Sequence, residues 1–270
     1  MFEAMLRAEA GNPGLDAPDG SARTRPRRGS RYAAAMALSK RDASGKGSAL
    51  DDPTYRSGVV ELLSLLAYGE ISAVEQLAQD GRMAPDLRSR VEVAALAAAE
   101  FDHFQQLRDR LVEMGVDPYE SMKPFEAIFQ RYHAKTQPSD YYESLLKAYV
   151  GDGLASDFYR EVAAFLETST RDLVVSTLSG TAHSQFVVDT VRAGIEQDPK
   201  IAGRLALWSR RLMGEALSQA QTVVAERDAL AAVLVGGVDV PGMDLAAIGR
   251  MFARITEAHT KRMERLGLAA

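Results

Sequence analysis

The chain has 270 residues, of which 46% are hydrophobic and 26% are charged. Its 32 basic and 37 acidic residues give a net charge of −5, which argues against a nucleic-acid binder held mainly by a large basic surface. The chain has no cysteine, so disulfides, thiolate catalysis and cysteine-ligated metal centres are excluded. Any metal ligands must therefore be histidine, aspartate or glutamate.

Residues 1–53 differ in composition from the rest of the chain. They are rich in glycine, serine, proline and arginine, as in DAPDGSARTRPRRGSR, and cannot bury enough apolar surface to fold. We therefore predict a disordered N-terminal tail over 1–53, a helical bundle with a fifth helix over 54–230, and an amphipathic C-terminal helix within 231–270. No apolar run approaches the roughly 20 residues that cross a bilayer, so we expect a cytoplasmic protein with no membrane segment.

Beyond Pro53 the apolar residues recur at helical spacing, and no segment alternates convincingly as a strand would. The predicted helices cover about 54–79, 84–114, 139–167, 169–196, 199–229 and 243–266, with a short helix near 122–135. Short turns within two helix pairs and a long link between the pairs describe an all-α four-helix bundle. The long crossover joins the second and third helices, and the additional helices are C-terminal.

Ionisable residues interrupt the apolar stripe of each of the four bundle helices. Glu70 lies in the stripe of the first helix, and Glu100 and His103 lie one turn apart in that of the second. Asp152 and His183 occupy the third and fourth stripes. Glu70 and His103 are 33 residues apart and Asp152 and His183 are 31 apart, so two similar antiparallel hairpins would bring these groups to one level.

A buried, unpaired carboxylate costs several kcal/mol, so three in one bundle require a compensating cation. The carboxylate-bridged pattern of ferritin-like proteins has one glutamate from each of two helices and Glu-x-x-His from each of the other two. Glu70, Glu100 and His103 fit this pattern, Asp152 fits with a shorter acid, and the segment before His183 lacks its glutamate. We predict that these five residues bind one or two iron ions, with manganese also compatible.

Other roles for the same residues remain open at this stage. Glu70 could pair with an arginine, Asp152 could cap a helix break at 151–153, and His183 could be a core histidine bonded to Ser179 or a tyrosine. His133 lies among polar neighbours and is expected to face solvent, and the same holds for His259.

Glycines stand beside two of the predicted ligands. Gly69 precedes Glu70, and Gly151 and Gly153 flank Asp152. Each glycine inside a helix costs up to about 1 kcal/mol relative to alanine. Their placement therefore indicates a bulge or a close approach of backbone at a site.

Four segments carry a family resemblance: YGEISAVEQLA, AEFDHFQQL, GDGLASDFYREV and GTAHSQF. Their order and spacing over about residues 55–230 resemble the MiaE family of ferritin-like tRNA hydroxylases, and most closely its actinobacterial-type branch. The resemblance implies a non-haem di-iron monooxygenase that hydroxylates the isopentenyl group of 2-methylthio-N6-isopentenyladenosine in tRNA. tRNA is thus a partner by resemblance alone, and the electron donor is not indicated.

By this resemblance Glu70, Glu100 and His103 match the first-half ligands. Asp152 stands in place of a glutamate and His183 matches the second-half histidine, whereas Gly180 replaces the remaining glutamate. Two hypotheses follow: a di-iron-type hydroxylase, or a non-catalytic ferritin-like scaffold with a vestigial metal site. The C-terminal helix could cap the bundle or form a homodimer contact.

Overall fold

The computed structural model describes residues 49–177, 181–235 and 244–269. Most of the predicted tail lies outside these residues. The described part is helical and contains no strand. Its elements in chain order are η2 (Ala49–Asp51), α3 (Pro53–Asp80), η3 (Gly81–Met83), α4 (Leu87–Glu113), α5 (Pro118–Met122), η4 (Lys123–Phe125), α6 (Glu126–Lys135), α7 (Tyr141–Ala163), α8 (Thr168–Ser176), α9 (Thr181–Gln197), α10 (Lys200–Glu226), α11 (Asp228–Val235) and α12 (Leu245–Arg265).

Aspartate residues begin the long helices. Asp52, Asp86, Asp140 and Asp244 each precede a helix, and each carboxylate accepts a hydrogen bond from the backbone N–H three residues later. Such a cap satisfies one of the free N–H groups of the first turn and contributes about 1 kcal/mol. The starts of α3, α4, α7 and α12 are therefore encoded locally.

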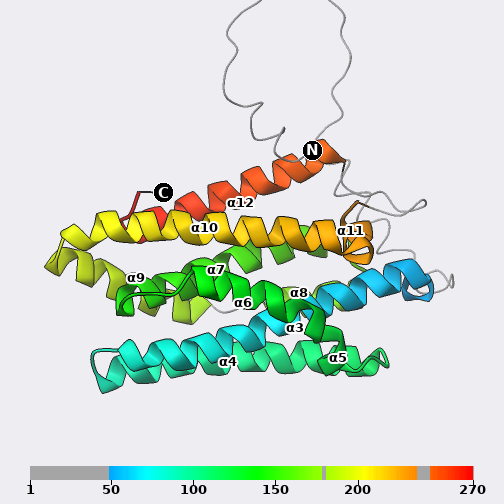
Figure 1. Cartoon of the computed structure of the whole chain (residues 1–270), viewed down its shortest axis with the longest axis horizontal. Helices are drawn as coiled ribbons and strands as arrows, with labels where there is room; N and C mark the ends of the chain where they lie inside the picture. Colours follow the sequence, from blue (N-terminus) through cyan, green and yellow to red (C-terminus); the bar gives the residue numbers. More distant parts are fainter. Residues whose placement is uncertain (1–48, 178–180, 236–243, 270) are drawn as a thin grey trace, which may run out of the picture.

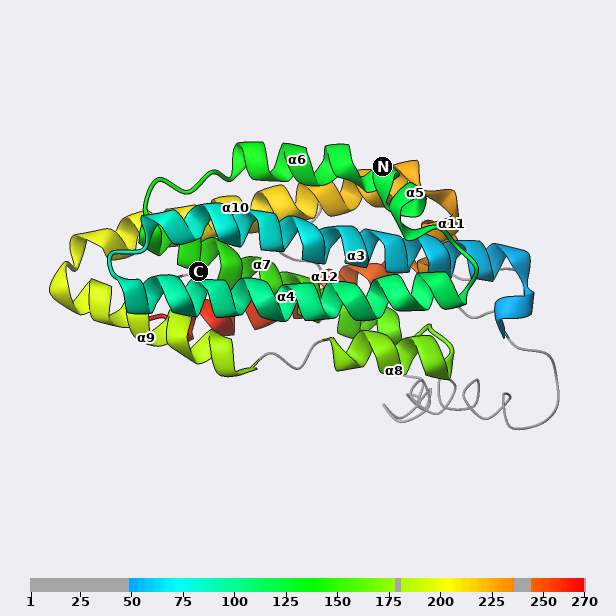
Figure 2. The same cartoon turned by 90° about the horizontal axis from the view of Figure 1, so that it is seen from below.

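The helices form an elongated bundle in which α7 is central. The α3–α4 hairpin lies on one side of α7, and α10 and then α12 lie on the other (Figure 1). The crossover from α4 to α7 passes through α5, η4 and α6, and Figure 2 shows α6 along one edge of the molecule with α8 along the opposite edge. The predicted all-α bundle, its long crossover and its extra C-terminal helices are confirmed.

Leucines fill the centre of the bundle. The fully buried ones come from α3, α4, α7, α10 and α11, together with Leu266 after α12, and all belong to a single core. Burial of each side chain stabilises the fold by about 1.5–3 kcal/mol relative to exposure. The fully buried leucines of these helices are Leu62, Leu63, Leu66, Leu107, Leu111, Leu145, Leu146, Leu205, Leu212 and Leu230.

The fourth helix of the bundle is not continuous, and the predicted single helix over 169–196 is wrong. α8 ends at Ser176, and the hydroxyl of Thr177 donates a hydrogen bond to the Val174 carbonyl. α9 begins at Thr181, and residues 178–180 lie outside the described residues. Thr177, at the described end of α8, is a weak helix former whose hydroxyl competes for backbone hydrogen bonds.

Two C-terminal helices pack on the bundle. α11 was not predicted as a separate helix; it contacts α3 so closely that a Cβ at Gly58 would collide with the carbonyl oxygen of Ala229. α12 lies on α7, where Arg262 contacts Asp157 and the Gly153 carbonyl. The structure thus shows α12 packed within the chain, and a homodimer through it remains a prediction.

One segment comes closer to a membrane span than the sequence suggested. By length and composition, Pro53–Met83 could cross a membrane, and it is the single such helix among the described residues. It packs against α4 and α11 and supplies buried leucines to the core. Its apolar character is therefore accounted for by its place inside the bundle.

Candidate metal centre

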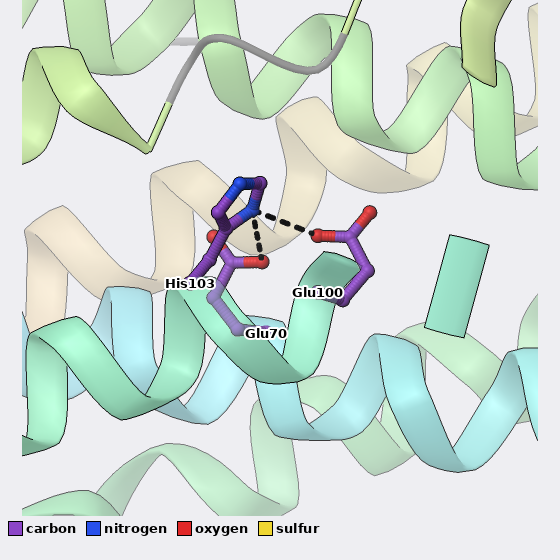
Figure 3. A group of neighbouring side chains, drawn as sticks. All are labelled: Glu70, Glu100 and His103. Atoms are coloured by element: carbon purple, nitrogen blue, oxygen red, sulfur yellow. Dashed lines mark ion pairs between the residues drawn. The ribbon is translucent and has the colours of Figure 1, made fainter. Parts of the chain in front are cut away.

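Three of the predicted ligands converge between α3 and α4. Glu70 comes from α3, and Glu100 and His103 come from adjacent turns of α4, so that all three side chains meet (Figure 3). One ligand atom from each residue lies within 4.8 Å of the others. Nδ1 of His103 lies 3.4 Å from Oε2 of Glu100 and 3.9 Å from Oε2 of Glu70.

The local sequence explains this convergence. Glu70 occupies a core position of α3 and is only 9% exposed. Glu100 and His103 are half-buried and share a face because residues three apart are neighbours on a helix. The short turn at η3 makes α3 and α4 antiparallel neighbours, so their central faces meet.

Burial and neighbouring groups shift the pKa values of Glu70 and His103. Burial raises the pKa of Glu70 well above its ordinary value, and the nearby Glu100 raises it further while His103 opposes the change. Hydrogen bonding to Glu100 and then to Glu70 raises the pKa of His103 to about 10. His103 is therefore an imidazolium between two acidic side chains when no metal ion is bound.

These residues fit a divalent cation. Two carboxylates and an imidazole are oxygen and nitrogen donors that suit iron, manganese or zinc. A dipositive ion would neutralise both acids and release the imidazole as a neutral ligand. Among the described residues, no arginine lies within ion-pair distance of Glu70, so the alternative arginine pairing is wrong.

Asp152 lies on α7 and faces the same cavity, outside the group of three. Its side chain is exposed to the cavity between the helices. Burial among protein atoms and repulsion from Glu100 accordingly raise the pKa of Asp152 to about 6. α7 continues unbroken through residues 151–153, so Asp152 does not cap a helix break.

His183 falls in the first turn of α9, but its side chain lies outside the described part of the chain. Its neighbours Ser184 and Val187 line the cavity, which places this end of α9 beside it. Gly180 also lies outside the described residues. Of the five predicted ligands, Glu70, Glu100 and His103 thus lie together and Asp152 lines the same cavity. The side chain of His183 is not described, so its role remains a prediction.

A cavity of about 330 Å³ adjoins the three ligands. This volume is within the range of small-molecule sites. α3, α4, α6, α7, α9, α10 and α12 all contribute to its wall. Most of its surface is apolar, and large apolar residues of the wall include Leu65, Leu96, Phe129, Phe158, Phe252 and Ile255.

The glycines beside the ligands have three different surroundings. A Cβ at Gly69 would lie 3.2 Å from Cζ of Phe129, so α6 approaches α3 closely there. Gly151 lines the cavity, and a Cβ there would meet no atom within 4 Å among the described residues. Gly153 makes room for Arg262 of α12. The predicted close approach is thus found at Gly69, where Phe129 of α6 meets α3, and at Gly153, where Arg262 of α12 meets α7. The approach at Gly153 packs two helices together and is not part of the metal site.

The prediction that His133 and His259 face solvent is wrong. Nε2 of His133 lies 2.8 Å from Oγ of Ser72, and its Nδ1 is buried. His259 is 5% exposed and contacts Oγ of Ser209. Both errors arise because α6 and α12 cover other helices through contacts distant in sequence.

Tyr159 belongs to the site although the sequence analysis gave it no functional role. Its phenol lines the cavity, and burial raises its pKa well above the ordinary value. Glu70, Glu100 and Asp152 act in the same direction, which places the phenol near all three acids. The signal was its position two turns after Asp152 on the apolar stripe of α7.

The fold and the acid–histidine cluster define a ferritin-like protein. The chain belongs to the family described as "Ferritin-like domain, actinomycetes", whose sequence model matches residues 53–237. It is also similar in structure to protein 19 with aldehyde deformylating oxidase activity from Synechococcus, with a TM-score of 0.62 and 16% identity over 80% of this chain and 93% of that chain. At this identity the likeness concerns the fold alone. No curated protein is similar to the chain in sequence.

Proposed function

We propose that the chain is a ferritin-like, metal-dependent oxygenase. Glu70, Glu100 and His103 hold a first metal ion, and Asp152 with His183 holds a second. The observation that carries the proposal is the convergence of two carboxylates and an imidazole beside an apolar cavity in the bundle. Iron is the proposed metal, with manganese compatible with the same ligands.

Bound iron would supply the activation of dioxygen, and the protein supplies the surroundings. The apolar wall excludes water and holds an apolar group of the substrate beside the ligands. The raised pKa of Tyr159 keeps its phenol protonated next to the acids. Hydroxylation of a C–H bond consumes dioxygen, two electrons and two protons and releases water, so the reaction needs an external reductant such as a ferredoxin or a reduced flavin.

The two metal positions are unequal. The first has three ligands already close together, whereas the second depends on Asp152 and His183 and has Gly180 where the resemblance implies a glutamate. A missing carboxylate removes a negative charge and up to two ligand oxygens. The second ion is therefore expected to bind more weakly, with water or a substrate oxygen completing its ligands.

The narrower proposal is hydroxylation of a tRNA nucleoside of the MiaE type. Its support is the resemblance of four sequence segments, together with a cavity that suits an apolar group. Charge offers no support. Residues 1–53 carry nine basic and seven acidic residues, a net charge of +2, so the remainder of the chain has a net charge of −7. tRNA substrates thus require a direct test.

Dioxygen uptake by the iron-loaded protein with a chemical reductant tests the broader proposal. The wild type should consume dioxygen, and Glu100→Ala should not, whereas Asp102→Ala on the exposed face of α4 should behave as wild type. Equal uptake by Glu100→Ala would contradict the proposal. A vestigial scaffold would show no protein-dependent uptake in any variant.

Nucleoside analysis of tRNA from cells that lack the gene tests the narrower proposal. Loss of the hydroxylated isopentenyl nucleoside, with recovery by the wild-type gene and not by the Glu100→Ala gene, would support it. An unchanged nucleoside content would contradict tRNA as the substrate and leave the oxygenase proposal to stand on dioxygen uptake.

A further inference from the structure

A second polar group lines the cavity away from the metal ligands. Lys147 of α7 is only 4% exposed and lines the cavity wall. Its Nζ is buried and has no hydrogen-bond partner among the described residues. The ring of Tyr132 lies 5.8 Å from this atom, a distance that suits a cation–π contact but satisfies none of its N–H groups.

Three further buried polar atoms on residues of the same cavity wall have no hydrogen-bond partner in the described part of the chain. They are Nδ1 of His133 on α6, Oη of Tyr149 on α7 and Oε1 of Gln219 on α10. Buried polar side-chain atoms are hydrogen-bonded in the large majority of cases. Four such atoms on one cavity wall therefore indicate a place for a polar ligand group or ordered water.

The position of this polar wall relative to the metal ligands follows from the helices. Lys147 precedes Asp152 by five residues on α7, a rise of about 7 Å along the helix axis. Asp80, also on the cavity wall, follows Glu70 by ten residues on α3, a rise of about 15 Å. Lys147 thus lies between one and two helical turns from Asp152 along α7, and Asp80 lies nearly three turns from Glu70 along α3.

We propose that the cavity binds an amphipathic carboxylate, with its carboxylate at Lys147 and its alkyl chain along the apolar wall toward Glu70 and Glu100. A lysine ammonium has three donors and no acceptor, so its natural partner is an anionic acceptor. The apolar remainder of the wall favours an alkyl chain over a second polar group.

Charged and titratable groups around Lys147 are compatible with this ligand. Asp80 of α3 is not within ion-pair distance of Lys147, and its carboxylate accepts a hydrogen bond from Nε2 of Gln76 at 3.0 Å. Burial lowers the pKa of Lys147 to about 8, while Asp80 opposes the change, so the ammonium persists at neutral pH. From α6, His133 is neutral because burial lowers its pKa to about 4.

The remaining groups on this side are also accounted for. Burial raises the pKa of Tyr132, which keeps its phenol uncharged. Glu215 of α10 is paired with Lys135 at 3.0 Å. Lys147 thus supplies the positive charge that an incoming carboxylate would meet.

This inference deepens the proposed function, because it names a substrate class for the same cavity, but binding itself uses none of the metal ligands. If both proposals hold, carbons of the alkyl chain lie next to the metal centre. The chemistry rests on the proposed function, whereas affinity for the carboxylate does not.

Isothermal titration of dodecanoate and dodecanol, below their micellar thresholds, tests the inference on the protein as purified and after chelation. Wild type and Lys123→Met, which removes an exposed lysine, should bind dodecanoate equally. Lys147→Met should lose affinity by about tenfold to a hundredfold, as expected for a hydrogen-bonded charge. Dodecanol should bind wild type more weakly than dodecanoate does.

Chelation separates this inference from the metal proposal. Wild type stripped of metal should bind dodecanoate as the protein as purified does. Loss of binding after chelation, with full binding in Lys147→Met, would place the carboxylate at the metal centre and overturn the inference.

The pH profile provides a test that does not depend on the folding of Lys147→Met. Wild-type affinity for dodecanoate should fall as pH rises above about 8, where the ammonium loses its proton. Lys147→Arg, which stays charged, should show no such fall. A flat wild-type profile through this interval would contradict the assignment of Lys147 as the carboxylate partner.

Discussion

Nδ1 of His103 lies 3.4 Å from Oε2 of Glu100, one helical turn before it on α4. Glu70 reaches the same imidazole from α3. Two acids and one base thus meet where an ordinary bundle would place leucines. This arrangement is unfavourable for an empty bundle and favourable around a bound cation.

Glu70→Gln should separate stability from metal binding. Glutamine has the same shape without the buried charge, so the metal-free protein should gain about 1–3 kcal/mol in free energy of unfolding. The same change should weaken metal binding. Chemical denaturation of chelated protein and metal titration would measure the two effects, and Glu75→Gln on the exposed face of α3 is the matched control. A less stable metal-free Glu70→Gln protein would contradict this account of Glu70.

Asp152→Asn should affect the second metal position alone. The first ion has its three ligands on α3 and α4, whereas Asp152 lies on α7. We expect the variant to keep its tighter metal and lose the weaker one in a titration followed by equilibrium dialysis. Complete metal loss, as expected for Glu100→Ala, would show that Asp152 helps to hold the first ion.

Two glycines of α7 should respond in opposite ways to alanine. Gly151→Ala adds a methyl group to open space and should stabilise the helix by up to about 1 kcal/mol. Gly153→Ala should destabilise the protein by about 1–2 kcal/mol, because Arg262 must leave its contacts with Asp157 and the Gly153 carbonyl. Thermal unfolding of both variants is the measurement. Equal shifts of Tm would contradict the packing of α12 on α7.

His133 should make the protein less stable in acid. Its pKa is lowered from 6.5 to about 4 by burial and then by the charge of Lys147. Between these values the unfolded chain binds a proton that the native protein does not. The free energy of unfolding therefore decreases as the pH is lowered from 6.5 to about 4, by on the order of 3 kcal/mol in total.

His133→Gln removes this contribution and keeps a hydrogen-bonding group near Ser72. The difference in unfolding free energy between the variant and the wild type should therefore change across the same pH interval. Urea denaturation at several pH values measures that difference. A constant difference would show that His133 is not the responsible group.

The sequence could predict much of the fold because its causes are local. Aspartate caps, glycine stops and apolar spacing define α3, α4 and α7 without knowledge of their neighbours. The group of Glu70, Glu100 and His103 could also be predicted from the sequence. Polar residues at the centre of the apolar stripes of two helices in one hairpin face each other when the hairpin forms. This part of the site depends on helix period and turn length alone.

Other parts depend on contacts between distant segments. His133 is buried because α6 folds back on α3, and His259 because α12 covers the bundle. The sequence carried no signal for Lys147, and only the folded structure shows that its ammonium is buried at the cavity wall. The end of α8 at Ser176 was missed because the helical spacing of apolar residues continues through this part of the sequence.

The metal content of protein expressed with added iron tests the central claim most directly. Elemental analysis should find one to two iron ions per chain in the wild type and in Asp102→Ala, and none in Glu100→Ala. The Tm values of the three chelated proteins should be equal, so that the loss of iron is not a loss of the fold. Metal retained by Glu100→Ala at the wild-type level, or no stoichiometric metal in any of the three proteins, would contradict a metal centre at Glu70, Glu100 and His103.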